Sequence, residues 1–324
     1  MSLQVSSSPH IRDNSTSQRL MLDVIIALIP TLAASLYLFG ERVLFIVIVT
    51  VLSAVLFEYL SRLVLKRYNS ISDLSAVVTG LLLALNLPPT VPFWLPIIGA
   101  FVAIVIVKQM FGGIGNNFVN PAMASRVILM LSFPVAMTKW VVSSTGSIPF
   151  GGAAGGNVDL VATATPLLQL QTGVVKGSFD YYLQLFIGNK GGCIGEVSIL
   201  ALLIGAAYLL IRKVISFHIP VVYIGTVAIM MLLLGQDPMI HLLAGGLVLG
   251  AVFMATDYVT SPLTNKGKII FGIGCGVITS LIRVYGGMTE GVSFSILLMN
   301  ILTPHIDRWT MPVPLGGGAV RAKG

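Results

Sequence analysis

The sequence predicts an all-α polytopic membrane protein, with ten transmembrane helices as two inverted five-helix repeats and one long extracytoplasmic loop. Three observations lead to this prediction. The chain is 56% hydrophobic and only 10% charged, whereas about 25% of the residues in soluble domains are charged. Apolar runs recur along the chain at about the length that a helix needs to cross a bilayer. The order of runs and breaks is similar in the two halves.

Ten apolar runs define the predicted spans. They lie at residues 20–39, 43–65, 74–88, 94–111, 121–137, 194–212, 217–235, 240–256, 269–285 and 291–303. Because a spanning helix needs about 20 apolar residues, the runs 74–88 and 291–303 are short. Pro88-Pro89 and the glycine-rich ends indicate broken helices, which membrane proteins tolerate where irregular backbone is buried in protein.

An internal repeat accounts for the two halves. An offset of 174 residues aligns Pro88 with Pro262, and Gly112-Gly113 with Gly286-Gly287. Each half has an odd number of spans, so the second half must enter the membrane from the opposite side. The repeats are therefore expected to be inverted, with sites near the midplane where short or broken helices meet.

The basic residues predict cytoplasmic termini. They gather in the segments that would face inward, at Arg12, Arg19, Lys66, Arg67, Arg212, Lys213, Lys266, Lys268, Arg308, Arg321 and Lys323. The resulting divisions are a cytoplasmic arm (1–18), the first repeat (19–137), the extracytoplasmic loop (138–193), the second repeat (194–304) and a cytoplasmic tail (305–324). Residues 1–18 carry no apolar stretch, so no cleavable signal peptide is expected.

Composition argues against several other classes of protein. The net charge of +7 follows from the inward-facing basic segments, so no nucleic-acid partner is expected. Cys193 lies at the outer end of a predicted span and Cys275 lies inside one, which makes a disulfide or a CxxC metal site unexpected. The four histidines are scattered and no metal centre is predicted. No dinucleotide-binding GxGxxG follows a strand, so the chain is not expected to bind NAD.

A polar break precedes the fifth predicted span. In Gly112-Gly113-Ile114-Gly115-Asn116-Asn117-Phe118-Val119-Asn120-Pro121-Ala122 the glycines permit tight turns. Asn120 before Pro121 is typical of a helix start, with the amide capping free N–H groups. A capped re-entrant turn is one interpretation. A polar pocket suited to an isoalloxazine edge or an anion is the other.

The long loop contains the octapeptide Asp159-Leu160-Val161-Ala162-Thr163-Ala164-Thr165-Pro166. It resembles the flavinylation motif shared by the D subunit of Rnf complexes and the B subunit of Na+-translocating NADH:quinone oxidoreductase. The resemblance implies that Thr165 carries FMN through a phosphoester bond and that Asp159 serves the modifying enzyme. Thr163 replaces the usual glycine and Ala162 the usual serine or threonine, which leaves Thr163 as a rival acceptor.

Further segments resemble the same family in order. The 112–122 segment is similar to its GGxGxNxFNPA signature, departing at Val119, and Phe253–Pro262 is similar to its FMATDxVTSP segment. The resemblance implies that Asn116, Asn120 and Asp257 lie near a non-covalently held flavin, often riboflavin. Arg283 and Glu290 fall in a segment similar to the following IRxxGGxxEG, and the resemblance makes them further candidates to bind the same flavin. The similarity runs from Ser8 to Asp307.

The resemblance implies a membrane component of an Rnf-type ferredoxin:NAD+ oxidoreductase in the bacterial plasma (inner) membrane, passing electrons through covalent FMN with coupled Na+ or H+ transport. The implied partners are the A, B, C, E and G subunits of the complex, a flavin transferase and the lipid bilayer. One alternative is the B subunit of the quinone reductase, which usually has a longer N-terminal extension. An alternative of another class is a passive small-solute channel of urea-channel-like fold.

Charged residues inside the predicted spans need partners, because a carboxylate at the bilayer centre costs several kcal/mol. Glu58 lies deep in the second run, and Arg62 follows it at the spacing that brings side chains together on a helix. We therefore predict an ion pair between them. Lys108 and Arg126, near the broken helices, are candidates to neutralise an anionic reduced flavin.

Overall fold

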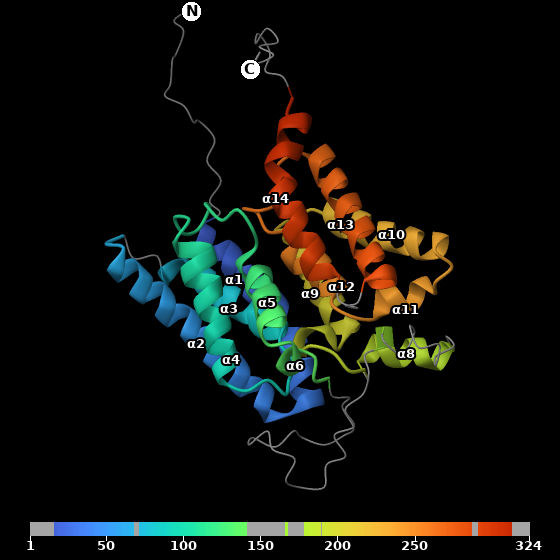
Figure 1. Cartoon of the computed structure of the whole chain (residues 1–324), viewed down its shortest axis with the longest axis horizontal. Helices are drawn as coiled ribbons and strands as arrows, with labels where there is room; N and C mark the ends of the chain where they lie inside the picture. Colours follow the sequence, from blue (N-terminus) through green and yellow to red (C-terminus); the bar gives the residue numbers. More distant parts are fainter. Residues whose placement is uncertain are drawn as a thin grey trace, which may run out of the picture.

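All regular structure is helical in the part of the chain that the computed structural model describes, namely residues 16–67, 71–140, 166–167, 178–188, 190–286 and 291–312 (Figure 1). This confirms the all-α prediction. The predicted site residues Asp159, Thr165 and Glu290, and the rival acceptor Thr163, lie outside the described residues.

The described residues of the first half form six helices, one 3-10 turn and one π-helical segment. They are α1 (Ser17–Phe39), α2 (Glu41–Val64), the 3-10 turn η1 (Ile71–Asp73), α3 (Ser75–Leu85), α4 (Trp94–Phe101), the π-helical η2 (Val102–Gln109), α5 (Pro121–Ser132) and α6 (Pro134–Met137). The predicted span 121–137 is not one continuous helix. It divides before Pro134, because a proline disfavours helical backbone at the residue before it.

The described elements after residue 177 are a helix in the predicted loop and the helices of the second half. They are α8 (Phe179–Ile187), the 3-10 turn η3 (Ile194–Glu196), α9 (Ile199–Ile211), α10 (His218–Leu233), α11 (Pro238–Leu243), α12 (Leu247–Leu249), the π-helical η4 (Gly250–Met254), α13 (Asn265–Tyr285) and α14 (Val292–Thr310). The predicted span 240–256 is broken after α11, where Gly245 adopts a φ of +68° that favours glycine.

Two further boundaries differ from the predicted ones. Helix α14 continues through Pro304 to Thr310, past the predicted end at residue 303, because hydropathy marks the apolar part of a helix rather than its last turn. Helix α8 lies within the predicted loop 138–193 and was not expected. Its short apolar run was too brief to count as a span.

Helices α1 and α9 pack side by side in opposite directions. Near the end of α1, the Ser35 hydroxyl donates to the carbonyl oxygen of Ile194, just before α9, at 2.6 Å. Near the start of α1, Asp23 accepts from the Tyr208 hydroxyl at 2.8 Å and from Arg212 at 3.4 Å, at the end of α9. The first helices of the two predicted repeats are therefore antiparallel.

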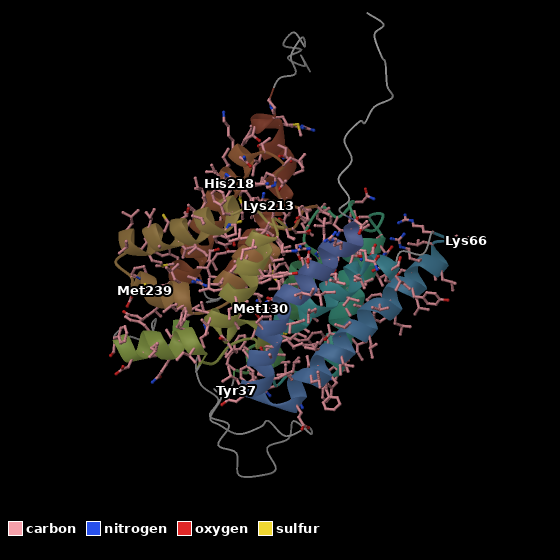
Figure 2. All side chains as sticks on the ribbon, turned by 180° about the vertical axis from the view of Figure 1, so that it is seen from behind. Tyr37, Lys66, Met130, Lys213, His218 and Met239 are labelled. Carbon is pink, nitrogen blue, oxygen red and sulfur yellow. The ribbon has the colours of Figure 1, made fainter. Side chains whose placement is uncertain are left out.

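Two of the basic segments gather at one end of the molecule. Figure 2 shows Lys66, after α2, and Lys213, after α9, toward one end, with Tyr37 near the end of α1 toward the other. Figure 1 shows α14 ending toward the top of the molecule and α8 toward the bottom, and Figure 2 places Lys66 and Lys213 in the upper part.

The helices have the length and surface of a membrane protein. Within the described residues, three helices are long and apolar enough to cross a bilayer: α1, α2 and α13. Large apolar side chains are exposed on α2 and α10, including Leu52 (64%), Val64 (76%) and Leu233 (76%). A soluble monomer rarely exposes apolar patches of such extent, so contact with lipid is the simplest account of these faces.

One apolar core joins the two halves. It contains Leu28 of α1, Leu83 of α3, Leu129 of α5, Leu202 of α9 and Phe271 of α13, each almost fully buried. Helices of both halves contribute to this core, so the two halves pack together as one unit.

Candidate functional site

A cavity lies where the two halves meet. Its wall is formed by α1, α3, η2 and the start of α5 from the first half, and by α9, η4 and residues 256–259 from the second. The space inside it that a water-sized sphere can occupy is about 90 Å³, which is below the range of about 300–1,000 Å³ of small-molecule sites. Its lining is mostly apolar, with a few polar groups: Ser75, Thr79, Lys108, Asn117, Asn120, Thr256, Asp257 and Tyr258.

Asn120 holds the start of α5 and links the halves. Its Oδ1 accepts from the backbone N–H groups of Ala122 at 3.1 Å and Met123 at 3.2 Å, which confirms the predicted helix cap. Its Nδ2 donates to the carbonyl oxygen of Met254 in η4 at 3.3 Å. The amide therefore ties the N-terminus of α5 to the broken helix of the second half, beside the cavity.

Asp257 reaches the same cavity from the second half. Its carboxylate accepts from the Thr260 hydroxyl at 3.2 Å and from the backbone N–H of Val259 at 3.5 Å. These contacts hold the carboxylate in the connection between η4 and α13. The structure thus brings together Asn120 and Asp257, two residues that are 137 positions apart in the sequence.

The glycine-rich segment before α5 turns tightly, as predicted. Gly112, Gly113 and Gly115 have φ values of +124°, +94° and +88°, in the region that favours glycine. Asn116 is exposed, and its side chain lies against Gly112, since a Cβ built there would be 2.8 Å from its Nδ2. It is the neighbouring Asn117 that lines the cavity.

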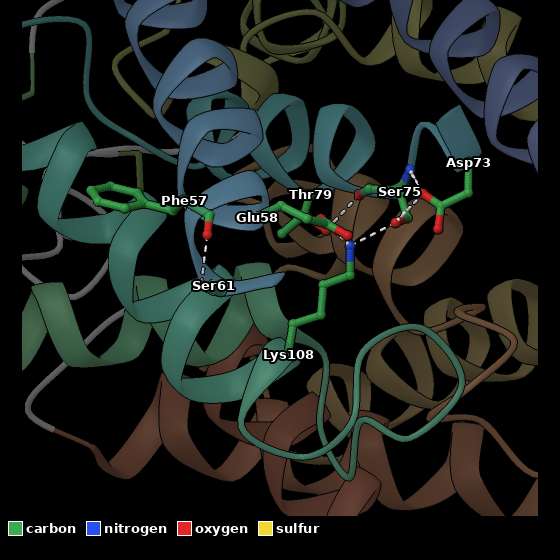
Figure 3. A network of polar contacts seen from close by, with 7 residues as sticks. All are labelled: Phe57, Glu58, Ser61, Asp73, Ser75, Thr79 and Lys108. Atoms are coloured by element: carbon green, nitrogen blue, oxygen red, sulfur yellow. Dashed lines mark hydrogen bonds and ion pairs between the residues drawn. The ribbon is translucent and has the colours of Figure 1, made fainter. Parts of the chain in front are cut away.

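Lys108 carries the positive charge of the cavity wall and is held by a buried ion pair. Its ammonium donates to Glu58 Oε2 at 2.7 Å and to the Ser75 hydroxyl at 2.6 Å (Figure 3). Ser75 in turn donates to Asp73 through its hydroxyl at 2.5 Å. Glu58 is therefore paired with a residue 50 positions away on η2, a partner that its helical spacing to Arg62 did not predict.

Arg126 lies apart from the cavity lining. Its guanidinium donates to Asn86 Oδ1 at 2.6 Å and to Glu196 Oε1 at 3.1 Å, and it contacts Cys193 Sγ at 3.2 Å. These groups are buried between α5, the end of α3 and η3. Arg126 therefore joins the halves at a second polar cluster.

Arg283 also lies away from the cavity. Its guanidinium donates to the carbonyl oxygens of His241 at 2.5 Å and Ala244 at 3.4 Å, at the end of α11. The predicted inner set is thus divided: Asn120 and Asp257 line the cavity, Asn116 is exposed beside it, and Arg283 lies at the end of α11.

Sequence reasoning missed Ser75, Lys190 and Glu196. Ser75 stands at the first turn of α3 and gave no motif, and Glu196 lies in a short 3-10 turn before α9. The sequence does mark Lys190, because this basic residue directly precedes the Gly191-Gly192 pair at the start of the second half. In the part of the chain that the structure describes, no group of three His, Cys, Asp or Glu side chains could hold a metal ion.

The lining of the cavity, though not its free volume of about 90 Å³, suits the flat ring of a flavin. Apolar side chains such as Val78, Leu82 and Phe253 offer faces for the ring, and Asn120, Asp257 and Lys108 offer polar groups for its edge. When bound, a flavin supplies electron transfer, while the protein sets its position and electrical environment.

Comparison with known proteins places the chain among membrane redox subunits. The sequence model of the NQR2, RnfD, RnfE family matches residues 4–316. The chain belongs to this family. Its cavity between broken helices is therefore a feature of a membrane protein of a bacterial complex.

Three curated relatives are similar over nearly their full length. The D subunit of the Na(+)-translocating ferredoxin:NAD(+) oxidoreductase complex of Acetobacterium woodii is 51% identical, covering 96% of this chain and 94% of the relative. The D subunit of the proton-translocating ferredoxin:NAD(+) oxidoreductase complex of Clostridium ljungdahlii is 45% identical, covering 96% of each. The D subunit of an ion-translocating oxidoreductase complex of Stutzerimonas stutzeri is 40% identical, covering 94% of each.

Proposed function

We propose that this protein is the D subunit of an Rnf-type ferredoxin:NAD+ oxidoreductase complex, which passes electrons through flavin and couples them to Na+ or H+ transport. The observation that carries the proposal is the 51% identity to the D subunit of such a complex over nearly the whole of both chains. The relatives are named for different coupling ions, so the ion is proposed as Na+ or H+. Its partners would be the A, B, C, E and G subunits of the complex.

The proposed outer redox group is FMN joined to Thr165 by a phosphoester bond. The support is the octapeptide Asp159–Pro166 and the residue that follows it. Leu167 is only 3% exposed and packs with Leu185 of α8 and Ile240 of α11, so the chain directly after the acceptor is anchored against the body. A flavin transferase would attach the group, with Asp159 contributing to recognition.

Covalent flavin should be detectable on a denaturing gel. We expect fluorescence at about 34 kDa from the chain co-expressed with a flavin transferase. Thr165→Ala should abolish the fluorescence because it removes the hydroxyl that bonds to the phosphate. Thr163→Ala is the matched control and should keep it. Loss of fluorescence in Thr163→Ala alone would move the attachment site to Thr163. Absence of fluorescence from the wild-type sequence would refute covalent FMN.

A second flavin, riboflavin in the simplest case, is proposed for the cavity between the halves. Thr165→Ala protein should then still release free flavin on acid treatment. Val78→Phe, made in the Thr165→Ala background, should abolish that release because the larger ring fills the cavity. Leu52→Phe, on the exposed face of α2, is the control and should leave it unchanged. Undiminished release from the Val78→Phe variant would place the second flavin elsewhere.

The proposed topology has ten spans in two inverted repeats, with both termini in the cytoplasm of a bacterial cell and the protein in its plasma membrane. Antiparallel packing of α1 and α9 supports the inversion. The grouping of Lys66 and Lys213 at one end supports a cytoplasmic assignment for that end. The opposite end would then carry α8 and the flavin on Thr165.

The two alternative functions receive less support. The family includes the B subunit of the quinone reductase, but the three relatives are all named as D subunits. A passive solute channel has no reason to keep a flavinylation sequence. Membership of a redox-subunit family favours electron transfer over passive transport.

A further inference from the structure

Two basic residues follow the last turn of α2 and lie against the end of η2. Lys66 adopts a φ of +51°, in the left-handed region that residues other than glycine rarely adopt. The backbone N–H of Arg67 donates to the carbonyl oxygen of Arg62 at 3.0 Å, which closes the end of the helix. Beyond this turn the guanidinium of Arg67 donates to the carbonyl oxygen of Gln109 at 3.0 Å. The basic pair, Lys66 and Arg67, therefore lies between α2 and the end of η2.

The basic pair has no counter-charge within the described part of the chain. Both side chains are exposed, and neither pairs with a described carboxylate. The acids closest in sequence have other partners, since Glu58 pairs with Lys108 and Asp73 accepts from Ser75. A guanidinium has five N–H donors, and that of Arg67 uses one of them on a described acceptor. The pair can therefore bind an anion.

A leucine stripe on α2 leads to the basic pair. Its members, Leu52, Leu56, Leu60 and Leu63, are all exposed. Their spacing of three or four residues places them on one face of the helix. At a rise of 1.5 Å per residue the stripe is about 16 Å long, which matches the depth of about 15 Å of one leaflet, half of the hydrocarbon core. Because α2 is long and apolar enough to cross a bilayer, the stripe can span one leaflet and end at the basic pair.

Exposed aromatic side chains lie beside the basic pair. Gln109, which accepts from Arg67, is followed by Met110 and Phe111, both exposed. The ring of Phe111 lies 4.7 Å from that of Phe118, which is also exposed. Exposed phenylalanine side chains suit the boundary between lipid headgroups and acyl chains. The end of α2 thus combines apolar, aromatic and basic groups, as the surface of a bilayer requires.

The end of α9 provides a comparison. Lys213 also follows a helix with a positive φ, of +56°, and lies with Lys66 in the upper part of Figure 2. Its neighbour Arg212 pairs with Asp23 at 3.4 Å, so part of the charge there is neutralised. The preference of basic residues for one side of a membrane explains both lysines. It does not explain why the charge at α2 has no counter-charge among the described residues.

We propose that the end of α2 binds the phosphate group of an anionic phospholipid such as phosphatidylglycerol. Lys66 and Arg67 would donate charge-assisted hydrogen bonds to the phosphate oxygens, and an acyl chain would lie along the leucine stripe. Basic groups between spanning helices suit anionic headgroups. A soluble anion would leave the stripe without a contact, which favours a lipid. The site is independent of both proposed flavins and of which side of the membrane this end faces.

Binding of defined lipids to the purified chain in detergent tests the proposal, with native mass spectrometry counting the lipids retained. Phosphatidylglycerol should bind more tightly than phosphatidylcholine with the same acyl chains, because only phosphatidylglycerol has a net negative charge. Lys66→Gln/Arg67→Gln should weaken the binding of phosphatidylglycerol by about 30-fold, as expected for two basic residues near an anionic surface. Equal affinity of the wild-type sequence and the variant would overturn the proposal.

Lys213→Gln is the matched control for the single change Lys66→Gln, because both lysines are exposed, follow a helix and have a positive φ. We expect Lys66→Gln to weaken phosphatidylglycerol binding by about fivefold and Lys213→Gln to leave it nearly unchanged. Equal weakening would show a general attraction of basic surface to anionic lipid and would reject a site at α2. Size-exclusion chromatography checks that each variant is folded.

Two further measurements separate a lipid from other occupants. Inorganic phosphate should not displace phosphatidylglycerol, because it offers no acyl chain to the leucine stripe. Displacement by inorganic phosphate would show a site for a soluble anion and reject the lipid. A Lys66→Gln/Arg67→Gln chain that binds phosphatidylglycerol normally but no longer co-purifies with other subunits would show that this surface contacts a protein.

Discussion

Replacing Gly205 with alanine is expected to lower the melting temperature of the detergent-solubilised protein by about 5–10 °C, since each kcal/mol lost shifts it by about 2–4 °C in proteins of 150–250 residues. Gly205 lies in α9 where that helix crosses α1. A Cβ there would lie 2.1 Å from the carbonyl oxygen of Ala27 and 3.0 Å from Phe253 Cζ. The nearer atom is backbone, so the helices would have to separate.

The physical reason is the way helices associate in a membrane. Without a hydrophobic driving force between them, spanning helices depend on close packing, and small residues allow their backbones to approach. Overpacking in a well-packed core typically costs about 1–3 kcal/mol and more when backbone must move. Because α1 and α9 are the first helices of the two halves, separating them also disturbs the cavity, to which both contribute.

Gly225→Ala is the matched control, to be compared by thermal unfolding followed by size-exclusion chromatography. Gly225 lies in α10, and a Cβ there meets no atom within 4 Å. Alanine is favoured over glycine inside a helix by about 0.5–1 kcal/mol, so this variant should unfold at the same temperature or slightly higher. Equal melting temperatures for the two variants would show that α1 and α9 do not pack as closely as described.

Hydropathy and helix-breaking residues were enough to predict the helical fold and many of its breaks. Asn120 and Pro121 mark the start of α5 because a capping amide and an N-terminal proline are local features. The break inside 240–256 was not predicted, because Ala244, Gly245 and Gly246 lie within an apolar run whose hydropathy is that of a continuous spanning helix. Only packing against Arg283 and Glu196 explains the two glycines.

The candidate site was only partly predictable for a related reason. Asn120 and Asp257 each lie at a helix break that the sequence marks, and both line the cavity. Arg283 resembled a member of the same set, but a residue's position in a motif does not give the direction of its side chain. Glu58 shows the same limit: its partner Lys108 comes from another helix, and no local spacing reveals such a contact.

Glu58→Leu is expected to destabilise the protein strongly, and so is Lys108→Met. Both side chains are at most 2% exposed, and their charged atoms are 2.7 Å apart. Removing one partner breaks a buried ion pair, which costs about 3–5 kcal/mol. Thermal unfolding of each single variant should show a correspondingly large fall in melting temperature.

The double variant Glu58→Leu/Lys108→Met should recover most of the loss. Replacing a buried ion pair by apolar residues of similar volume is often neutral or stabilising, because neither charge then needs to be desolvated. The exposed end of α9 offers a control: Arg212 is 41% exposed and pairs with Asp23 at 3.4 Å, so Arg212→Met should cost about 1 kcal/mol or less. A double variant as unstable as the sum of its singles would contradict the pairing.

If the double variant folds well, the ion pair is not needed for stability. Its position on the cavity wall then favours an electrostatic role toward a ligand in the cavity. Lys108 and Ser75 line the cavity and Glu58 lies directly behind them, so the apolar variant would remove the positive charge beside the proposed inner flavin. We expect the midpoint potential of the extractable flavin to fall in that variant, because a nearby cation favours the more negative, reduced ring. An unchanged potential in a well-folded double variant would show that Lys108 does not act on a flavin in the cavity.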